Sequence, residues 1–488
     1  MNQENVTLIL GAGIGGLTTA IRLAAAGRRV IVLEKNEAVG GKMGEWRAGG
    51  FRWDTGPSVI TMRHVLEDLF AAAGRDLRDY LTLLPVEPLT RYFFAQGGTL
   101  DASVDLATMQ AQIAGVAPAD SEGYARYLAY AADIHRVTGP VFIYGPPPGW
   151  RQFLQVPPWD WLKADGLRTM SQAIAGHVQS PEIRQLLGRF ATYAGASPYL
   201  APATLNVIAH VELAGGVWYP QGGIYAIASA LARLAAELGV EIRCGCAVKR
   251  ILTKGRTVQG VELADGEQIS AGVVVSNIDV ATTMQTLLPA TGYQPPAANS
   301  CSGFIMLLGV EGQDARLAHH NIFFSEDYEA EFDAIFARGE PPVDPTIYVA
   351  ITAKTDETDA PSGHENWFVL VNAPSLDSHF DWEKERYRYR DLVLQRLAER
   401  GFSLSGRLRE TKILTPLELK NGSGAWQGAL YGASANDRWA ALRRPPNRSR
   451  YWRGLYFAGG TTHPGGGVPM VMLSGKVAAE MVLGDERE

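Results

Sequence analysis

Three glycines and one acidic residue near the start of the chain have types and spacing suited to holding a phosphate-linked ligand. Gly11, Gly13 and Gly16 follow the apolar run 6–10, and Glu34 ends the next apolar run. Gly11 permits a tight turn, Gly13 has no Cβ to keep a pyrophosphate away, and Gly16 lets a helix pack against a strand. Glu34, roughly twenty residues on, is placed to accept hydrogen bonds from a ribose hydroxyl. Together these residues predict a dinucleotide site.

The elements that must position these residues form a strand–helix–strand unit. We expect a buried strand over 6–10, a helix over 14–26 and a second buried strand over 30–33. The N-terminus of the helix, at Ile14 and Gly15, presents unpaired N–H groups and a partial positive charge to phosphates. This order of elements predicts an α/β fold with a Rossmann-like sheet.

Composition and charge limit the classes of function that fit. The chain has 488 residues, 46% of them hydrophobic, a formal net charge of -6 and a sequence pI near 5.9. Its length suits about three domains, and its acidic balance gives no electrostatic footprint for nucleic acid. Cys244, Cys246 and Cys301 are too few for a disulfide framework and lack the four ligands of a structural zinc site. We therefore expect reduced cysteines and no metal.

The first residues and the apolar runs bear on where the protein works. Residues 1–4 are not basic, and the apolar run after them is interrupted by glycines, so we expect no secretory leader. No run of apolar residues is long enough to predict a membrane-spanning helix. We expect a cytoplasmic protein.

A second glycine-rich segment, near the C-terminus, favours FAD over NAD as the dinucleotide. Residues 454–461 are expected to form a strand that ends in Gly459 and Gly460, and a helix is expected over 471–481. The expected cofactor contacts leading into this helix are Gly467, Val468, Pro469 and Met470. A helix N-terminus here would stabilise the negative charge of reduced flavin, which a nicotinamide does not need. Since no second dinucleotide unit follows, we expect the electrons to pass to a quinone or to oxygen.

Seven short motifs run in order along the chain: Gly11–Gly16 with Glu34, Gly40–Lys42, Asp54–Ser58, Gly216–Gly223, Val274–Asn277, Ala425–Gly428 and Gly459–Pro469. On these motifs the whole chain resembles the bacterial phytoene desaturase family of FAD-dependent carotenoid desaturases. Lys42 stands where that family often has Arg, and it reaches a phosphate as a point charge rather than a fork. Residues 193–199 and 201–204 look more like those of hydroxycarotenoid 3,4-desaturases.

The resemblance adds candidate cofactor contacts and a candidate catalytic residue. The further contacts that it implies are Lys35, Gly41, Lys42, Asp54, Gly56, Pro57 and Val248. Val248 would offer its backbone to adenine, although a plain core valine fits the sequence equally well. The resemblance also places His463 near the reactive end of the flavin, where proton transfer, closing a turn and positioning a phosphate are all open roles.

The implied chemistry needs few protein acids or bases. A hydride would leave an allylic C–H of a long-chain carotenoid for flavin N5, a proton would leave the neighbouring carbon, and the conjugated chain would delocalise the charge. We therefore expect no catalytic triad, and structural hydrogen bonding for Glu212. His319 and His320 are adjacent, so on a strand they would face opposite ways, which argues against a shared metal.

We predict a cofactor domain assembled from separated pieces of chain. The pieces are 1–75, 215–295 and 430–488, with a helical, membrane-facing insert over 76–214 and an α+β substrate domain over 296–429. This is the division of the amine oxidase and phytoene desaturase type. A sheet faced by helices beside a cofactor domain is a common way to form a substrate pocket.

A proline- and aromatic-rich segment over 139–162 suggests contact with a membrane surface. Its Trp and Tyr residues favour the membrane–water interface, and Arg151 and Lys163 suit anionic headgroups. One hypothesis is that the segment enters one leaflet, as in a peripheral, monotopic protein, and admits a lipid-dissolved substrate. The alternative is a loop whose aromatic side chains pack on the protein.

Three other functions compete with desaturation. A redox-neutral carotenoid cis-trans isomerase would share the fold but leave the substrate mass unchanged. An amine oxidase typically has a lysine by the flavin, and the C-terminal segment has none before Lys476. A non-catalytic lipid-binding escort protein would keep the fold without catalytic flavin, which the intact glycines and Glu34 argue against.

Overall fold

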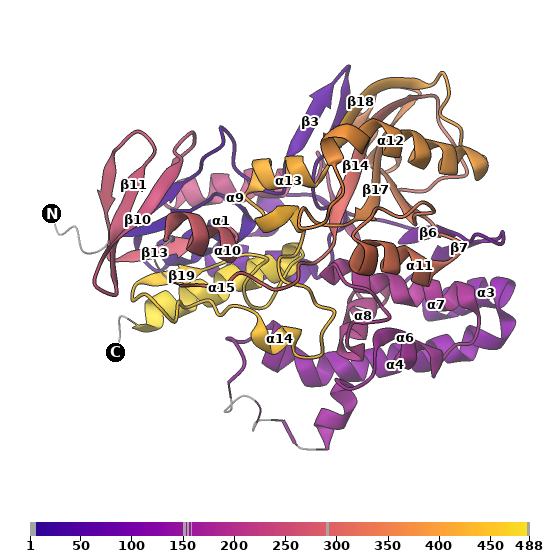
Figure 1. Ribbon diagram of the computed structural model, residues 1–488, viewed down its shortest axis with the longest axis horizontal. Coiled ribbons are helices and arrows are strands. Elements are labelled where there is room, and N and C mark those ends of the chain that lie inside the picture. The colour runs from indigo at the N-terminus through magenta and orange to yellow at the C-terminus, as the bar shows by residue number, and fades with distance from the viewer. Residues whose placement is uncertain (1–5, 150–152, 154–155, 158, 289–291, 486–488) are drawn as a thin grey trace.

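The computed structural model describes residues 6–149, 153, 156–157, 159–288 and 292–485. Figure 1 shows three regions: one built on a parallel sheet at the left, one on a mixed sheet at the upper right, and a helical region at the lower right. The first contains segments from both ends of the chain and from its middle, which confirms the expected α/β fold with a discontinuous Rossmann-type sheet.

The parallel sheet has five strands in the order β19-β13-β1-β2-β9. Their bounds are Leu455–Phe457, Val273–Ser276, Val6–Leu10, Arg29–Leu33 and Glu241–Arg243. All four pairings are parallel, so the carboxyl ends of the strands lie at one edge. Strands from both ends of the sequence are therefore brought to the same edge, where ligands bind in open α/β sheets.

Successive side chains of each strand point to opposite faces of this sheet. The two faces therefore pack against different elements. Ile9 and Val275 pack with the helices α1 (Ile14–Ala25), α9 (Tyr225–Glu237) and α15 (Val468–Asp485). Leu8, Leu10 and Val274 pack with the small sheet on the other face. That sheet consists of β10 (Val248–Lys254), β11 (Thr257–Leu263) and β12 (Gln268–Ser270).

The mixed sheet has seven strands in the order β18-β14-β17-β16-β15-β6-β7. Their bounds are Leu408–Leu414, Ser302–Glu311, His364–Ala373, Ile347–Ile351, His320–Phe323, Thr90–Phe93 and Thr99–Ala102. Helix α12 (Trp382–Glu399) covers one face, where its residues pack with Phe304 and Met306. The alternate residues Ile305 and Leu307 pack with Phe51 and Trp53 on the other side. Strands β6 and β7 come from the stretch 76–214, whose α-helices begin only after them.

Two short antiparallel pairs connect these sheets: β3 (Glu45–Ala48) with β4 (Phe51–Asp54), and β5 (Leu83–Pro85) with β8 (Trp218–Pro220). The helical region contains α3 (Leu106–Val116), α4 (Ser121–Thr138), α6 (Met170–Ala175), α7 (Pro181–Gly188) and α8 (Val207–Leu213). The remaining helices are α2 (Arg63–Ala72), α10 (Val280–Thr282), α11 (Tyr328–Asp333), α13 (Pro416–Ser423) and α14 (Ala440–Arg443).

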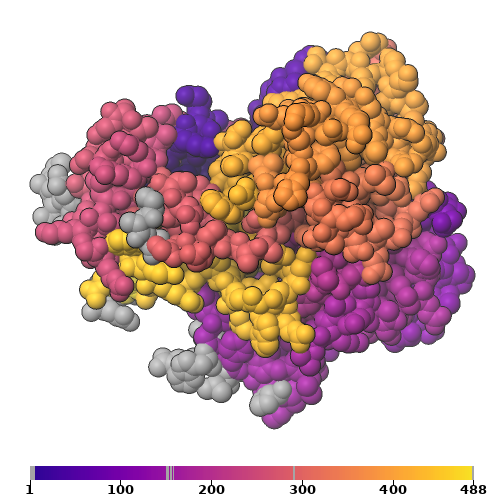
Figure 2. All heavy atoms as spheres, viewed as in Figure 1, coloured from indigo at the N-terminus to yellow at the C-terminus, as the bar shows by residue number. Residues whose placement is uncertain are grey.

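The space-filling view shows how the C-terminal segment joins the regions. In Figure 2 the yellow C-terminal residues lie between the parallel-sheet region and the magenta helical region. The three cysteines are free thiols. No helix among the described residues is long and apolar enough to cross a bilayer.

Candidate functional site

The carboxyl ends of β1, β13 and β19 converge closely. Asn277, directly after β13, donates from Nδ2 to the carbonyl oxygen of Ala458, 2.7 Å away, at the end of β19. A Cβ on Gly13 would lie 2.5 Å from Asn277 Oδ1, and a Cβ on Gly15 would lie 2.7 Å from Nδ2 and 3.2 Å from Gly459 Cα. The glycines therefore let three strand ends meet in one place.

The first turn of α1 is free to bind an anion. Gly13 is its N-cap with extended backbone, no side chain caps the turn, and no acidic residue lies in it. Gly11 has a φ of +93°, and a Cβ on Gly16 would lie 2.3 Å from the Gly11 carbonyl oxygen. The N–H groups of Ile14 and Gly15, which have no partner within the helix, and the helix dipole suit a pyrophosphate, as predicted from the sequence.

Glu34 is buried beside this turn. Its Oε2 accepts from Ala12 N at 2.7 Å, and its Oε1 accepts from Asn36 N at 2.9 Å and Nδ2 at 2.8 Å. Oε2, which accepts the one bond from Ala12, has further acceptor capacity for a hydroxyl donor. The predicted ribose contact is compatible with this position.

Lys42 places a positive charge beside the same turn. Its Nζ donates to the carbonyl oxygen of Leu430 at 2.7 Å, although the residue is accessible to solvent. Surrounding protein lowers the pKa of Lys42, and the negative charge of Asp279 opposes that shift. Among the described residues no carboxylate lies within 4.0 Å of this amine. An anionic ligand beside Lys42 would supply a closer negative charge than Asp279 does.

The other candidate contacts differ in their exposure and in the space around them. A Cβ on Gly41 would lie 3.2 Å from Gly13 Cα, and one on Gly56 would lie 1.8 Å from the Lys42 carbonyl oxygen, so both positions require glycine. Lys35 is exposed and donates to the carbonyl of Asn421 at 2.8 Å. Pro57 is half-buried in the turn after Gly56.

Val248 begins β10 close to the end of β2. Two residues earlier in the chain, Cys246 N donates to the Glu34 carbonyl oxygen at 2.8 Å. Val248 is half-buried and packs at the margin of the sheet's apolar core. Its backbone contact with adenine stays a prediction.

Asp54 belongs to a buried ionic network. Arg52 donates from Nη1 to Asp54 Oδ1 at 2.9 Å and also pairs with Asp359. Asp54 Oδ1 accepts from Tyr225 N at 3.1 Å, at the start of α9. These contacts support an indirect role, in which Asp54 fixes α9 and the adjoining loop, and the predicted cofactor contact of Asp54 itself stays a prediction.

The loop from β19 to α15 forms the other side of the site. Gly459 has a φ of +136°, and its N–H donates to Ser474 Oγ at 3.0 Å. Helix α15 begins directly after Gly467 and has no acidic residue in its first turn. Its first residues, Val468, Pro469 and Met470, therefore lie at a positive helix end, and Gly460 precedes them in the loop.

His463 tethers this loop to the helical region. Its Nε2 lies 3.0 Å from the carbonyl oxygen of Gly145, which can only accept, so Nε2 carries the hydrogen. Burial lowers the pKa of His463 to about 4, with a further contribution from the charge of Arg444. The side chain is therefore neutral near pH 7. This geometry favours closing the turn over proton transfer among the roles that the sequence left open.

A buried ion pair, which the sequence did not reveal, lies near the loop. Arg189 and Glu212 are in contact with side chains only 6% and 2% exposed, and the half-buried Tyr193 donates its hydroxyl hydrogen to Glu212. Glu212 thus has the hydrogen-bonding role expected of it. Tyr193 also interacts with Arg189, so the three side chains form one polar cluster.

Close packing connects this pair to the start of α15. A Cβ on Gly195 and one on Gly466 would lie 2.7 Å and 2.4 Å from the ring of Tyr431. Tyr431 therefore fills the space between the segment that carries Tyr193 and the loop before α15.

The expectation that His319 and His320 face opposite ways was wrong. Only His320 lies in a strand, and the two ring centroids are 4.3 Å apart. His319 Nδ1 is bonded to Thr355 Oγ1 at 2.6 Å and His320 Nδ1 to the Tyr348 hydroxyl at 2.8 Å. No cluster of metal-ligating side chains occurs in the described parts of the chain.

The residues present fit FAD. Glu34 would hold the adenosine ribose, the first turn of α1 with Lys42 the pyrophosphate, and the N-terminus of α15 the flavin ring. The fit rests on glycines with no room for a Cβ and on a lysine without a carboxylate partner. Asn277 lies in the motif Val274–Asn277, but the motif alone does not predict its place in the site. Its hydrogen bond to Ala458 joins segments that are far apart in the sequence.

Comparisons with known proteins identify the family of this chain. Residues 14–303 match the family described as flavin containing amine oxidoreductase. The chain is 36% identical over 497 residues to 4,4'-diapolycopene oxygenase of Methylomonas sp, with 99% of each chain covered. It is 35% identical over 486 residues to 4,4'-diaponeurosporene oxygenase of Staphylococcus aureus (strain MSSA476), with 97% of each covered.

Solved structures share the fold. The chain superimposes on an oxidoreductase from Methanosarcina mazei with a TM-score of 0.65 and 17% identity, covering 97% of this chain and 100% of that one. Cyclohexylamine oxidase from Brevibacterium oxydans IH-35A gives a TM-score of 0.61 and 18% identity, covering 99% and 100%. At these identities the likeness establishes the fold alone.

Proposed function

This chain belongs to the flavin containing amine oxidoreductase family, and we propose that it is an oxidoreductase that oxidises a linear, long-chain carotenoid. Its cofactor is FAD, as in that family. The observation that carries the proposal is the full-length similarity to oxygenases named for 4,4'-diapolycopene and 4,4'-diaponeurosporene. The fit of FAD to the glycine turn at Gly11–Gly16, with Glu34 and Lys42 beside it, supports the same proposal.

The type of oxidation is the finer part of the proposal. The sequence motifs predict desaturation, with two hydrogens lost from neighbouring carbons, whereas the names of the relatives favour insertion of oxygen. The polar cluster of Arg189, Glu212 and Tyr193 supports oxygen insertion, because a hydrocarbon product needs no hydrogen-bonding partner. Oxygenation is therefore our first candidate and desaturation the second.

The residues of this chain would bind FAD, orient its ring and stabilise charge on the ring. When bound, FAD supplies the acceptor for the substrate's electrons. The turn at Gly13, with Lys42, would hold the pyrophosphate and so set the position of the ring. The positive end of α15 would stabilise charge on the ring, and neutral His463 keeps the loop closed. The electron acceptor that completes the cycle is proposed to be a quinone or oxygen.

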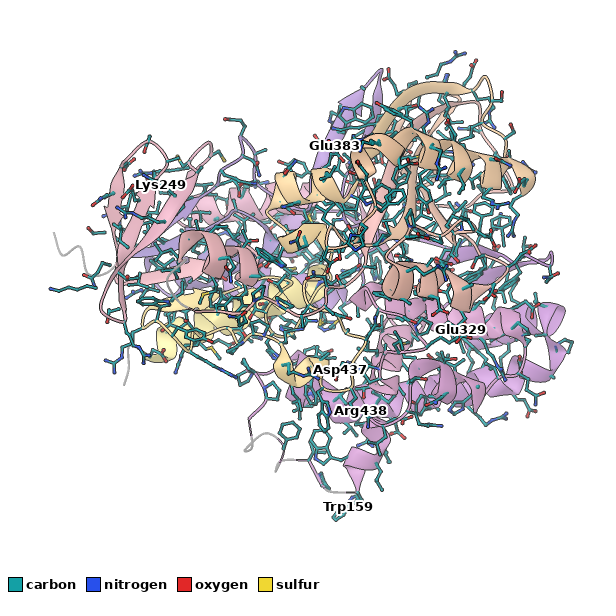
Figure 3. All side chains as sticks on the ribbon, viewed as in Figure 1. Trp159, Lys249, Glu329, Glu383, Asp437 and Arg438 are labelled. Carbon is teal, nitrogen blue, oxygen red and sulfur yellow. The ribbon has the colours of Figure 1, made fainter. Side chains whose placement is uncertain are left out.

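A membrane surface is the proposed source of the substrate. Trp159, Leu162 and Leu167 are 71%, 84% and 84% exposed, and Figure 3 places Trp159 at the tip of the helical region. Exposed tryptophan and leucine at a protruding tip suit insertion into one leaflet. Part of the segment 139–162 lies outside the described residues, including Arg151. Phe142, Phe153 and Trp161 pack on one another, as the alternative of a packed loop requires.

Pigment analysis tests the proposed function. The chain would be produced with 4,4'-diapolycopene or 4,4'-diaponeurosporene in a host that makes one of them, and the pigments would be resolved by mass. A gain of oxygen supports an oxygenase, a loss of two hydrogens a desaturase, and an unchanged mass with altered absorption an isomerase. An unaltered pigment bound to the protein would indicate an escort role and contradict the proposal.

A further inference from the structure

Arg444 lies against the loop that leads into α15. It follows α14, and its Nη1 donates to the carbonyl oxygen of Gly460 at 2.9 Å. A Cβ on Gly465 would lie 3.5 Å from the Cζ of Arg444, so the guanidinium rests on this glycine. Three residues later, Asn447 donates to the carbonyl oxygens of Phe457 and His463, which fixes the segment along the loop.

The charge of Arg444 has no close counter-charge in the described part of the chain. Among the described residues no carboxylate lies within 4.0 Å of its guanidinium, whereas the neighbouring Arg443 pairs with Asp437 and Arg448 pairs with Asp485. Burial lowers the pKa of Arg444 to about 10, so the group is still charged at neutral pH. The charge also reaches His463, whose pKa it helps to lower.

A second positive pole lies at the same loop. Helix α15 has 18 residues, and no acidic side chain lies in its first turn. A charge that is partly removed from water and has no counter-charge is costly, and the half-buried Arg444 adds to a helix N-terminus of the same sign. Such an arrangement is stabilised when a negative charge arrives with a ligand, and the ligand that fits this edge of the sheet is FAD.

We propose that Arg444 stabilises the negative charge that the flavin ring acquires on reduction. A hydride carries two electrons and a proton from a C–H bond of the donor to the ring, and the ring, neutral when oxidised, then bears one negative charge. Arg444 keeps its proton throughout and acts through space across the loop of Gly460 and Gly465. The inference rests on the bound flavin and does not depend on which donor the enzyme oxidises.

Sulfite binding to the oxidised holoenzyme tests this role without any substrate. Sulfite adds to flavin N5 and leaves a negative charge on the ring, so its affinity reports the local positive potential. For Arg444→Gln we expect sulfite affinity to fall by about tenfold or more, the order of effect of one charge at low effective dielectric constant. The midpoint potential of the flavin should become more negative in the same variant.

Two matched variants separate charge from packing. Arg443→Gln removes one positive charge from the adjacent, exposed position and should leave both readouts unchanged, because water screens that charge. Arg444→Lys keeps the charge and should retain most of the sulfite affinity. Arg444→Met provides a second neutral variant, with FAD content measured for each protein.

Three results would overturn the proposal. The first is an unchanged sulfite affinity and potential in Arg444→Gln, and the second is an equal change in Arg443→Gln. The third is weaker FAD binding in both neutral variants with an unchanged potential, or complete loss of FAD that Arg444→Lys reverses. That third result would place the charge at the pyrophosphate instead of the ring.

Discussion

Glu331 shows how one buried carboxyl makes the stability of this protein depend on pH. Its Oε2 accepts from Ser325 Oγ and from the backbone and hydroxyl of Thr346, while its buried Oε1 has no partner among the described residues. Burial outweighs these bonds and raises the pKa of Glu331 to about 7. A raised carboxyl pKa means that folding favours the protonated form.

The first prediction follows from that sign. The stabilising contribution of Glu331 to the free energy of unfolding is fully present below a pH of about 4.5 and is lost as the pH rises through about 7. The loss is at most about 3 kcal/mol. Glu331→Gln should therefore raise the Tm relative to wild type at pH 8 and change it little at pH 5. The exposed Glu329→Gln, on the same helix, is the control. Equal Tm differences at both pH values would contradict the assignment.

His463 provides a second prediction at this scale. If it serves as a donor to Gly145, then His463→Gln, which keeps an N–H at a similar position, should retain most activity, and His463→Phe should lose it. The activity of the wild type should show no titration of this residue between pH 5 and 8, because its pKa is about 4. Equal, large losses of kcat in both variants would instead identify proton transfer.

Among the elements, the strand–turn–helix unit at the N-terminus carries the cofactor site. The sequence predicted β1, α1 and β2 to within two residues, because continuous apolar runs and the glycine turn are local signals. Helix α15 begins at Val468, three residues before the predicted start. The pairing of β6 with β15 joins residues far apart in sequence, and no local pattern reports it.

The same distinction explains which site residues the sequence missed. Gly13, Glu34 and Lys42 lie in motifs with a fixed spacing. Arg444 lies in a proline-containing loop without periodicity, and its significance depends on the absence of a nearby carboxylate. The contact of Tyr193 with Glu212 depends on how two helical segments pack.

Packing at the first turn of α1 leads to a prediction for this element. In Gly16→Ala the new Cβ would collide with the Gly11 carbonyl, so the turn must shift and the purified protein should retain less than about a tenth of its FAD. Gly115→Ala in α3, where nothing lies within 4 Å, should retain FAD and be slightly more stable. FAD released on denaturation gives the measurement, and full retention in Gly16→Ala would refute the assignment.

On the scale of the whole molecule, the proposed membrane contact lies at one end of the helical region. This end is also tethered to the loop between β19 and α15. The hydrogen bond between His463 and Gly145 connects the start of the segment 139–162 with the loop before α15. In Figure 3, Asp437 and Arg438 beside α14 lie between this tip and the parallel-sheet region.

Flotation with liposomes tests this arrangement. Replacing Trp159 and Leu162 by Ser should reduce co-flotation with anionic vesicles several-fold, because each buried apolar side chain contributes roughly 1.5–3 kcal/mol. Val343→Ser, at a residue that is also 71% exposed but lies in the mixed-sheet region, should float as wild type does. Undiminished flotation of the double variant would support the packed-loop alternative.

Reconstitution with alternative flavins tests the central claim most directly. Protein stripped of flavin would be mixed with liposomes containing 4,4'-diapolycopene and supplied with FAD, with FMN or with neither, and the pigment mass would be recorded. We expect an oxidised pigment with FAD alone, because FMN lacks the adenosine half that Glu34 and the first glycine turn would hold. Oxidation without FAD, or an unchanged pigment in protein that has bound FAD, would contradict the account.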